Sequence, residues 1–346
     1  MSRLRLIETA KFSARTAILE AASLAASTGL SNKPRGRGVI LTLHHVRPKI
    51  SSPLDPNGHL EITPDFLELV ITELAARGYD FLSIEAVPAR LAGPETRPFA
   101  VFTLDDGYRD NVDHALPVFE RHGVPFTVFA CTGFIRRTHS LWWETALALL
   151  RSETSLTLDL GQGIETLPAR SVAQKRAAYA VIGQRIMQGD ERRAIAALNE
   201  AARARGLDPL ASAHALVLDE AELKALSRHP LATIGAHSVS HRAMARLSPE
   251  ELHQEIISSR DAVAAIIGRT PTAFAFPYGH HAQAGPRESE ALAACGFTLG
   301  VTTVQALLQT GDGSRLTAAP RVNLDGRLQK RRYVAGLASG LAFRRR

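Results

Sequence analysis

The chain has 346 residues, of which 45% are hydrophobic and 22% are charged, a balance typical of a globular protein with a substantial core. It contains no uninterrupted apolar run of about 18 residues, so a membrane-spanning helix is not expected. The net charge of +7 is unevenly spread: residues 1–38 carry +5, residues 327–346 carry +7, and residues 39–326 carry −5. Because the positive charge lies at the two ends and no nucleic-acid-binding module is evident, binding to nucleic acid is not expected.

The two ends are expected to lie outside the main domain. Residues 2–27 follow a helical pattern with an imperfect apolar face, and the breaker-rich stretch SNKPRGRG (residues 31–38) is typical of a linker. The basic C-terminal tail, residues 327–346, is expected to be solvated. Peripheral contact of the two basic ends with an anionic membrane is the main alternative.

The protein is expected to be cytoplasmic, and a peripheral position at the inner membrane is the alternative. The N-terminal segment mixes Arg, Lys and Glu through its apolar residues, unlike a signal peptide. Cys131 and Cys295 cannot form a disulfide framework, which fits a reducing compartment. Both cysteines are expected to be small core residues.

The main domain is expected over residues 39–326, where short apolar runs alternate with helical patterns. This domain begins with the apolar run VILTL, followed by the helical stretch TPDFLELVITELAARG, the apolar run FAVFTL, the helical stretch NVDHALPVFERHG, and the apolar run PFTVFAC. Residues 138–216 are rich in Ala, Arg and Glu at helical spacing, which predicts a helical insertion. Strand and helix patterns then resume with ATIGAH, SPEELHQEIISSRDAVAAIIG, TAFAFP, ESEALAACG, FTLGVTT and APRVNL. This alternation predicts an α/β fold whose parallel strands form a (β/α) barrel, with chemistry at their carboxyl ends.

Two adjacent carboxylates, Asp105 and Asp106, follow the strand candidate FAVFTL. Because neighbouring carboxylates repel each other, a cation is expected beside them. His237 and His241 follow another strand candidate, and their four-residue spacing would place both imidazoles on one side of a helical turn. Asp106, His237 and His241 together form a predicted ligand set for a divalent metal ion, with Zn²⁺ the expected ion.

The neighbouring residues have predicted catalytic roles. Asp105 is free to act as the general base, while Gly107 allows a sharp turn beneath the two carboxylates. The segment AFAFPYGHH also ends a strand candidate, and the backbone N–H of Tyr278 could donate to a developing oxyanion. A plain strand-to-helix turn is the alternative. H-x-x-x-H and Asp-Asp-Gly are each weak signals, and only their joint occurrence at strand ends is specific.

The three segments together resemble the polysaccharide deacetylase family, also described as the NodB-homology domain or carbohydrate esterase family four. FTLDDG is similar to the family motif T-F-D-D-G, HSVSH to H-[ST]-x-x-H, and FPYG to the end of R-x-P-Y-G. The resemblance spans about residues 39–326. It implies a distorted (β/α) barrel and metal-dependent removal of N-acetyl groups from N-acetylglucosamine-type oligo- or polysaccharides. It also implies the roles given above for Asp105, Asp106, His237, His241 and Tyr278.

Two departures from the family pattern leave catalytic roles open. Ala275 stands where the family often has an arginine that tunes the base, and Arg321 could supply that charge from another direction. No late Leu-x-His motif, which often carries the general acid, is evident, so His44 in LTLHHV is the substitute candidate. A structural histidine is the alternative for His44, and the weaker rivals for the acid are His45, His280 and His281.

The nature of the substrate is less specific in the sequence. Trp142 and Trp143 could present an aromatic face to a sugar ring, and core packing is the alternative. Without an evident signal peptide, the chain resembles chitooligosaccharide deacetylases more than secreted wall-modifying enzymes. Two other functions stay open: hydrolysis of another non-peptide C–N bond on the same fold, and glycan binding with weak catalysis in polysaccharide assembly.

Overall fold

A parallel β-sheet forms the centre of the molecule in the computed structural model, which describes residues 3–27, 36–94 and 97–343. Its strands are β1 (Gly38–Leu43), β4 (Asp80–Phe81), β5 (Phe99–Leu104), β6 (Phe126–Ala130), β9 (Ala232–Ala236), β10 (Ala273–Ala275), β11 (Leu299–Val301) and β12 (Val322–Asn323). Their order is β11-β10-β9-β6-β5-β1-β12, and β4 pairs with β5. An isolated parallel bridge pairs Val301 of β11 with Ala319, which lies shortly before β12 in the chain. The predicted α/β fold with a distorted barrel is therefore confirmed.

The central strands are almost entirely apolar, with Thr42 and Thr103 as the polar exceptions in β1 and β5, because the sheet is covered on both faces. Every residue of GVILTL in β1 and of FAVFTL in β5 is buried. The pairing between these strands is parallel and in register from Gly38 opposite Phe99 to Leu43 opposite Leu104. A parallel strand with both faces buried has no polar face, so its sequence is a nearly continuous apolar run.

Helices surround the sheet, and their ends follow local signals in the sequence. The α-helices of the barrel are α2 (Pro64–Ala76), α3 (Val87–Ala92), α4 (Leu116–His122), α5 (Thr132–Ile135), α10 (Glu220–Leu226), α11 (Pro249–Ile267) and α12 (Pro286–Ala294). Ser248 and Glu251 form a capping box at the start of α11, and Gly268 ends this helix with a positive φ of 79°. Short helical turns occur at Gly58–Leu60, Ile84–Ala86, Asn111–Ala115, Met244–Arg246 and Asp312–Ala318, and β2 (His45–Val46) pairs with β3 (Glu61–Ile62).

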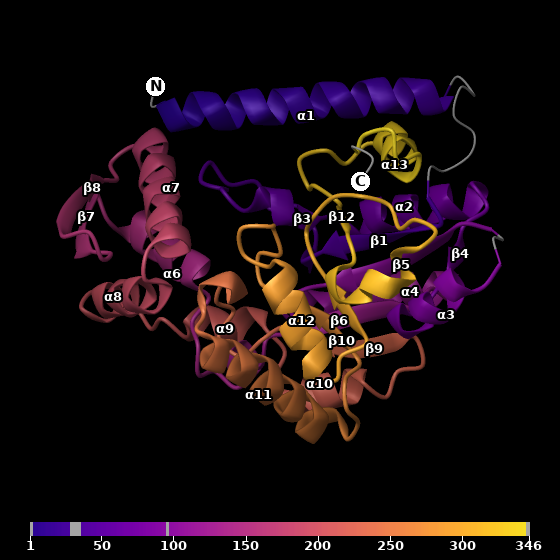
Figure 1. Cartoon of the computed structure of the whole chain (residues 1–346). Coiled ribbons are helices and arrows are strands. Elements are labelled where there is room, and N and C mark those ends of the chain that lie inside the picture. The colour runs from indigo at the N-terminus through magenta and orange to yellow at the C-terminus, as the bar shows by residue number, and fades with distance from the viewer. Residues whose placement is uncertain (1–2, 28–35, 95–96, 344–346) are drawn as a thin grey trace.

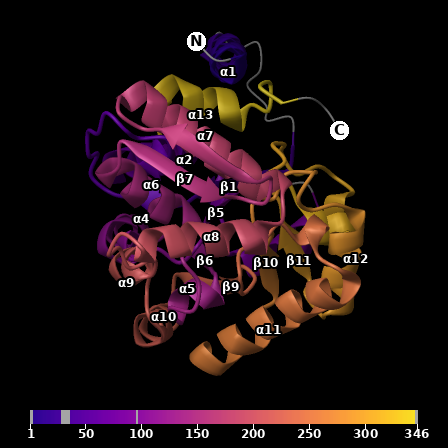
Figure 2. The ribbon, with the colours of Figure 1, turned by 90° about the vertical axis from the view of Figure 1, so that its left-hand side faces the viewer.

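The insertion lies on one side of the barrel (Figure 1), and in the turned view it lies in front of part of the sheet (Figure 2). It contains α6 (Trp142–Ser152), β7 (Ser155–Asp159), β8 (Ile164–Pro168), α7 (Val172–Gln188), α8 (Glu191–Arg203) and α9 (Ala211–Leu216). The segment predicted as a helical insertion thus contains four α-helices, and it also contains an antiparallel hairpin of β7 and β8 that was not predicted. Its turn uses Gly161 and Gly163 with φ of 95° and 94°, and both backbone N–H groups donate to the Asp159 carboxylate.

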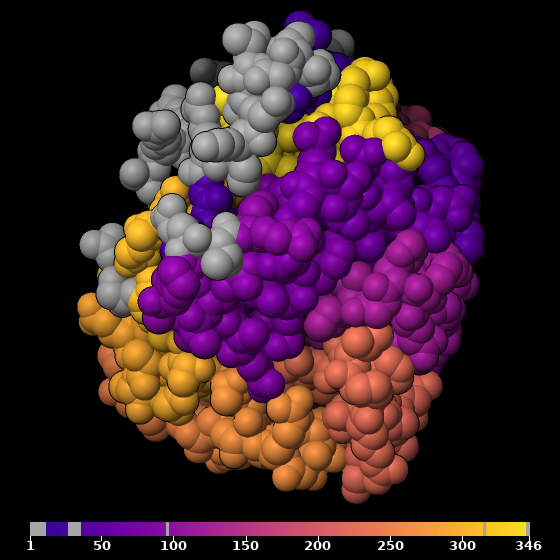
Figure 3. Space-filling model, turned by 90° about the vertical axis from the view of Figure 1, so that its right-hand side faces the viewer, coloured from indigo at the N-terminus to yellow at the C-terminus, as the bar shows by residue number. Residues whose placement is uncertain are grey.

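The two basic ends pack on each other and on the barrel. Helix α1 (Arg3–Ser27) lies across α13 (Arg331–Ala338), as Figure 1 shows, and Arg332 donates to both carboxylate oxygens of Glu20 at 2.8 and 2.6 Å. Helix α13 also contacts α2, and the Tyr79 hydroxyl donates to the Ala338 carbonyl at 2.9 Å. In the space-filling view the yellow C-terminal segment is continuous with the surface of the barrel (Figure 3).

The structure therefore differs from the expected solvated C-terminal tail, because apolar residues of α13 are buried against α1 and α2. Most of the expected linker, residues 31–35, lies outside the described residues. None of the helices in the described part of the chain combines the length and apolar character required to cross a bilayer.

Candidate metal centre and active site

The predicted site residues come from loops that adjoin neighbouring strands of the sheet. His44 follows β1, Asp105 and Asp106 follow β5, His237 follows β9, and Tyr278 lies shortly after β10. In a parallel sheet the carboxyl ends of the strands lie at one edge, so these distant segments meet there. Arg321 immediately precedes β12 and reaches the same place with its long side chain.

Asp106, His237 and His241 form a buried cluster that could hold a metal ion. The Asp106 Oδ1 atom lies 3.4 Å from His237 Nε2 and 3.3 Å from His241 Nε2. The same oxygen is buried and has no hydrogen-bond partner among the described residues. A buried carboxylate oxygen that faces two imidazole nitrogens is suited to a divalent cation, because the ion would satisfy all three atoms at once.

The tautomer of His237 is set by its second ring nitrogen. His237 Nδ1 donates to the Ala275 carbonyl at 2.7 Å, which leaves Nε2 with its lone pair toward Asp106. Burial alone would lower the pKa of His237, but the facing Asp106 carboxylate raises it above its ordinary value. Burial would likewise raise the pKa of Asp106, and the two imidazoles lower it well below the usual range. Asp106 is thus an ionised carboxylate, and a cation that replaced the proton shared with the imidazoles would face its negative charge.

The segment from His237 to Ala243, called the histidine loop below, is not a helical turn. Ser238 and His241 have positive φ angles of 60° and 57°, and the His241 N–H donates to Ser238 Oγ at 2.9 Å. The expected reason for the convergence of the two imidazoles was therefore wrong. A loop with two left-handed residues brings both rings to Asp106, whose own φ is 73°.

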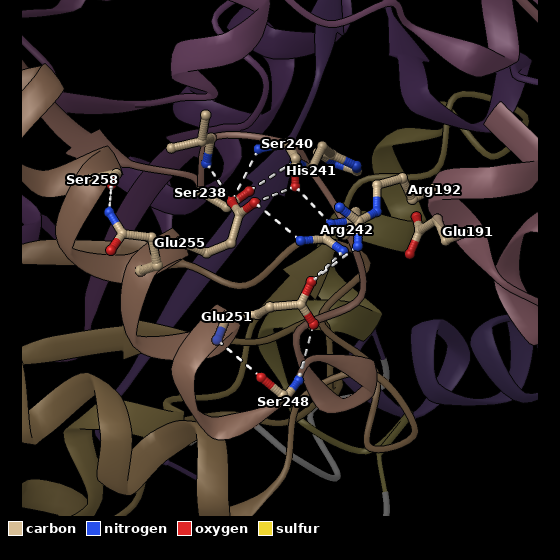
Figure 4. Close-up of polar contacts among 12 residues, drawn as sticks. Glu191, Arg192, Ser238, Ser240, His241, Arg242, Ser248, Glu251, Glu255 and Ser258 are labelled. Atoms are coloured by element: carbon tan, nitrogen blue, oxygen red, sulfur yellow. Dashed lines mark hydrogen bonds and ion pairs between the residues drawn. The ribbon is translucent and has the colours of Figure 1, made fainter. Parts of the chain in front are cut away.

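Polar contacts from other elements hold the histidine loop (Figure 4). The Glu255 carboxylate of α11 accepts hydrogen bonds from the N–H groups of Val239 at 2.8 Å and Ser240 at 3.0 Å. Arg242 lies 3.3 Å from Glu251 and 3.6 Å from Glu255, both on α11. Residues in the left-handed region persist only where their surroundings hold them, and Glu255 supplies part of that restraint.

Asp105 is paired with Arg321, which is completely buried. Arg321 Nη1 and Nη2 lie 2.7 Å from Asp105 Oδ1 and Oδ2, and Arg321 Nε donates to the Thr302 carbonyl at 2.9 Å. Burial would raise the pKa of Asp105, but the guanidinium outweighs burial and lowers it. Asp105 is therefore an ionised carboxylate in a fixed orientation beside the metal cluster.

Tyr278 lies against the metal cluster and occupies a strained turn. Its φ is 59°, and its ring centroid lies 4.9 Å from that of His241. The Thr303 hydroxyl donates to the Tyr278 carbonyl at 2.7 Å, and the Thr303 N–H donates to the Gly279 carbonyl at 2.9 Å. No partner for the Tyr278 backbone N–H is found among the described residues. The role of this N–H as an oxyanion donor stays a prediction.

His44 borders the cluster, with its Nδ1 atom buried and without a hydrogen-bond partner in the described part of the chain. Burial lowers the pKa of His44 to about 4, against the opposing effect of Asp105 and Asp106. The Asn111 side-chain amide donates to the His44 carbonyl at 2.8 Å and so fixes the backbone there. At neutral pH the His44 imidazole is neutral and must gain a proton before it can act as an acid.

The rival histidines have different surroundings. His45 Nδ1 lies 2.5 Å from Asp110 Oδ2, and its ring stacks on Tyr108 at a centroid distance of 3.6 Å. His280 and His281 are exposed. The assignment of His44 as the general acid therefore stays a prediction.

Trp142 and Trp143 are buried, so packing is the role that the structure displays. The Trp142 indole N–H donates to the Tyr278 hydroxyl at 3.0 Å, and the Trp143 ring lies 5.2 Å from the His241 ring. Stacking on a sugar ring would require an exposed aromatic face. Contact of the two indoles with substrate is untested and stays a prediction. Cys131 and Cys295 are also buried, as expected, and neither forms a disulfide.

Sequence reasoning missed the polar residues that hold the site together. These are Glu191 of the insertion, Glu255 of α11, and Asp110 and Asn111 beyond the Asp-Asp-Gly turn. Glu191 and Glu255 look like ordinary helix residues in the sequence. For Asp110 and Asn111 a signal was present, because both residues lie in FTLDDGYRDN, the stretch that contains the two central carboxylates.

Comparison with known proteins agrees with this architecture. The family model described as "Polysaccharide deacetylase" matches residues 92–299. Among the curated proteins, none matches the sequence of this chain. Solved structures with a similar fold include IcaB of Ammonifex degensii, with 17% identity and a TM-score of 0.55 over 88% of this chain and 98% of that one.

Two further structures show the same fold. The deacetylase PplD of Streptococcus pyogenes, solved in complex with acetate, has 17% identity and a TM-score of 0.51 over 83% of this chain and 92% of that one. A de-N-acetylase of Aggregatibacter actinomycetemcomitans has 13% identity and a TM-score of 0.51 over 84% and 95% of the respective chains. At these identities the likeness establishes the fold and not the substrate.

Proposed function

Because this chain belongs to the polysaccharide deacetylase family, we propose that it is a metal-dependent hydrolase that removes N-acetyl groups from N-acetylglucosamine-type oligo- or polysaccharides. The observation that carries the proposal is the buried Asp106–His237–His241 cluster beside the fixed carboxylate of Asp105. The Asp106 carboxylate faces the two imidazoles, whereas the neighbouring Asp105 carboxylate does not belong to that cluster. This separation of roles is what a metal-assisted hydrolysis requires.

Asp106, His237 and His241 would hold the divalent ion, and three protein ligands of this kind favour Zn²⁺ with room for further ligands. A bound ion of this type supplies Lewis acidity, which lowers the pKa of water and polarises the acetyl carbonyl. The proposed reaction adds water to the acetamide, breaks its C–N bond, and releases acetate and the free amine.

The protein groups have distinct parts in this proposal. Asp105 accepts the proton of the attacking water, because each of its oxygens keeps a second lone pair after pairing with Arg321. The Tyr278 backbone N–H donates to the oxygen that becomes negative as the water attacks. His44 is neutral at neutral pH, so it would take up the proton that Asp105 has accepted and pass it to the leaving amine, since it borders both carboxylates of the site.

The test combines metal analysis with acetate release from acetylated amino-sugar oligomers, with chitooligosaccharides as the first substrates. The zinc-loaded protein should release acetate, and Asp105→Asn should lower the rate by about 10²- to 10⁴-fold, the usual contribution of a general base. A chelator should abolish the activity of the wild-type protein, and added Zn²⁺ should restore it. A metal-loaded protein that leaves every acetylated oligomer intact would contradict the proposed function.

We also propose a cytoplasmic location with peripheral contact at an anionic membrane surface. The support is the two free cysteines and the net charges of +5 and +7 on residues 1–38 and 327–346. Deletion of the C-terminal segment would be a poor test, because α13 packs on α1 and α2. Replacement of exposed Arg331 by Gln should instead weaken cosedimentation with vesicles that contain phosphatidylserine. Unchanged cosedimentation of this variant would count against the contact.

A further inference from the structure

Glu191 is a buried carboxylate of the helical insertion that touches two parts of the candidate active site. It is the first residue of α8 and is only 5% exposed. Its Oε1 accepts a hydrogen bond from the Tyr278 hydroxyl at 2.8 Å, and its Oε2 accepts one from the Ala243 N–H at 2.9 Å. Burial of an acidic side chain costs free energy unless hydrogen bonds compensate for the lost water. The two hydrogen bonds of Glu191 provide this compensation.

The two partners of Glu191 lie at the two loops that matter for the proposed chemistry. Ala243 ends the histidine loop, two residues after the candidate ligand His241. Tyr278 carries the backbone N–H proposed as the oxyanion donor, and its ring packs against His241 at 4.9 Å. A single carboxylate therefore links the loop that would bind the metal to the turn that would bind the oxyanion.

A second residue of the insertion completes this connection. The Trp142 indole N–H, at the start of α6, donates to the same Tyr278 hydroxyl at 3.0 Å. The hydroxyl thus accepts from Trp142 and donates to Glu191, so its single proton is directed toward the carboxylate. Both contacts come from the insertion, and they restrain a tyrosine whose φ of 59° is unfavourable for a residue with a side chain.

Glu191 also complements the restraint that α11 provides. Figure 4 shows Glu191 and Glu255 on opposite sides of the segment that contains His241 and Arg242. Glu255 accepts from the N–H groups of Val239 and Ser240, whereas Glu191 accepts from the N–H of Ala243. The histidine loop is therefore held near its middle by the barrel and at its end by the insertion.

We propose that Glu191 is a positioning residue through which the insertion aligns the Tyr278 turn with the histidine loop. The expected effect of Glu191 on catalysis rests on the proposed function. Through Glu191, the insertion becomes part of the structure that supports the active site. Because Glu191 acts through Ala243 and Tyr278, its effect on turnover is indirect.

The experiment compares Glu191→Ala, Glu191→Gln and Tyr278→Phe with the wild-type protein. Glu200→Ala is the matched control, because Glu200 is an exposed glutamate on the same helix. Glu191→Ala should lower kcat at least tenfold with KM changed by less than about threefold, since oxyanion contacts act in the transition state. It should also weaken Zn²⁺ binding several-fold in a competition assay with a chelator. Glu200→Ala should match the wild type in all three quantities.

A double-variant comparison tests the link between Glu191 and Tyr278. The amide of Gln keeps one acceptor oxygen, so Glu191→Gln can retain the Ala243 contact while it loses the charged acceptor for the tyrosine. Glu191→Gln and Tyr278→Phe should therefore lower kcat by similar factors, and their combination should be little worse than either alone. Fully multiplicative losses in the double variant would overturn the proposed link.

Amide hydrogen exchange gives a readout that does not depend on activity. The Ala243 amide and its neighbours in the histidine loop should exchange faster in Glu191→Ala than in Glu200→Ala. If the wild-type protein released no acetate, the proposed function would fail, while this comparison would still decide whether Glu191 restrains the loop. Equal exchange, kcat and zinc affinity in the Glu191 variants and the Glu200 control would overturn the inference.

Discussion

Arg321 and Asp105 form a bidentate ion pair in the interior of the protein, although 216 positions separate them in the sequence. Both nitrogen–oxygen distances are 2.7 Å, and both side chains are buried. The planar guanidinium matches the two carboxylate oxygens, an arrangement that a lysine ammonium cannot reproduce. The pair fixes the direction of Asp105 and keeps it ionised.

Arg321→Lys should therefore lower kcat at least tenfold even though the positive charge is kept. Arg321→Met should also destabilise the fold by about 3–5 kcal/mol, because a buried carboxylate is left without its partner. Acetate release and urea-induced unfolding would measure the two effects. Arg203→Lys, at an exposed position of α8, is the control and should leave both unchanged. Full activity of Arg321→Lys would show that bidentate pairing is not needed.

Metal binding should raise the stability of the folded protein. Zn²⁺ at about 100 times its dissociation constant should add about 2.7 kcal/mol to the free energy of unfolding, if the unfolded chain does not bind it. Asp106→Asn should lose most of this gain, because it removes the negative charge of the candidate ligand set. Asp113→Asn, at a nearby exposed position, should retain it. Thermal unfolding with and without Zn²⁺ measures the difference, and an equal gain in both variants would argue against Asp106 as a ligand.

Gly279 should be intolerant of a side chain for two separate reasons. Its φ is 60°, and an added Cβ would lie 2.7 Å from the backbone nitrogen of Thr303. Gly123 has nearly the same φ of 61° but has no atom within 4 Å of such a Cβ. Gly123→Ala should thus cost about 1–2 kcal/mol for the backbone conformation alone. Gly279→Ala should cost more and should also lower kcat by displacing the Tyr278 turn. Chemical denaturation would measure the loss of unfolding free energy in each variant. Equal losses would show that the contact with Thr303 is unimportant.

Asp325 should make the attachment of α1 dependent on pH. Its carboxylate lies 3.3 Å from Arg15 of α1 and 2.7 Å from Arg327. Burial would raise the pKa of Asp325, but Arg327 lowers it below the ordinary value of 3.8. A lowered pKa stabilises the fold above pH 3.8, and this stabilisation disappears as the pH falls through the lower folded value.

Asp325→Asn should accordingly reduce the free energy of unfolding by about 1–3 kcal/mol near neutral pH, as expected for hydrogen bonds to charged groups. The gap between wild type and variant should stay constant above about pH 5 and narrow in more acidic solution. Urea titrations at a series of pH values would measure this gap. A gap that widens on acidification would contradict the assigned direction of the pKa shift.

Local patterns in the sequence were enough to predict the fold class and most of the elements. Apolar runs such as FAVFTL are long enough to be strands buried on both faces, and capping signals such as Ser248 with Glu251 mark helix starts. The hairpin of β7 and β8 was missed because its short alternating pattern lies between strongly helical stretches. The C-terminal helix was missed because its apolar residues are buried only through packing against α1 and α2, which a local pattern does not show.

Through its local motifs, the sequence by itself determined the α/β class and which carboxylate and imidazoles could gather around a cation. Such motifs are readable because each one ends a strand, and parallel strands end at one edge. Only the tertiary structure decided that Arg321 faces Asp105, that Glu191 meets Tyr278, and that a left-handed loop presents His241. These relationships join residues far apart in the chain or depend on backbone angles that several elements impose together. No local pattern encodes them, because each exists only when the packed sheet and helices bring the partners within hydrogen-bond distance.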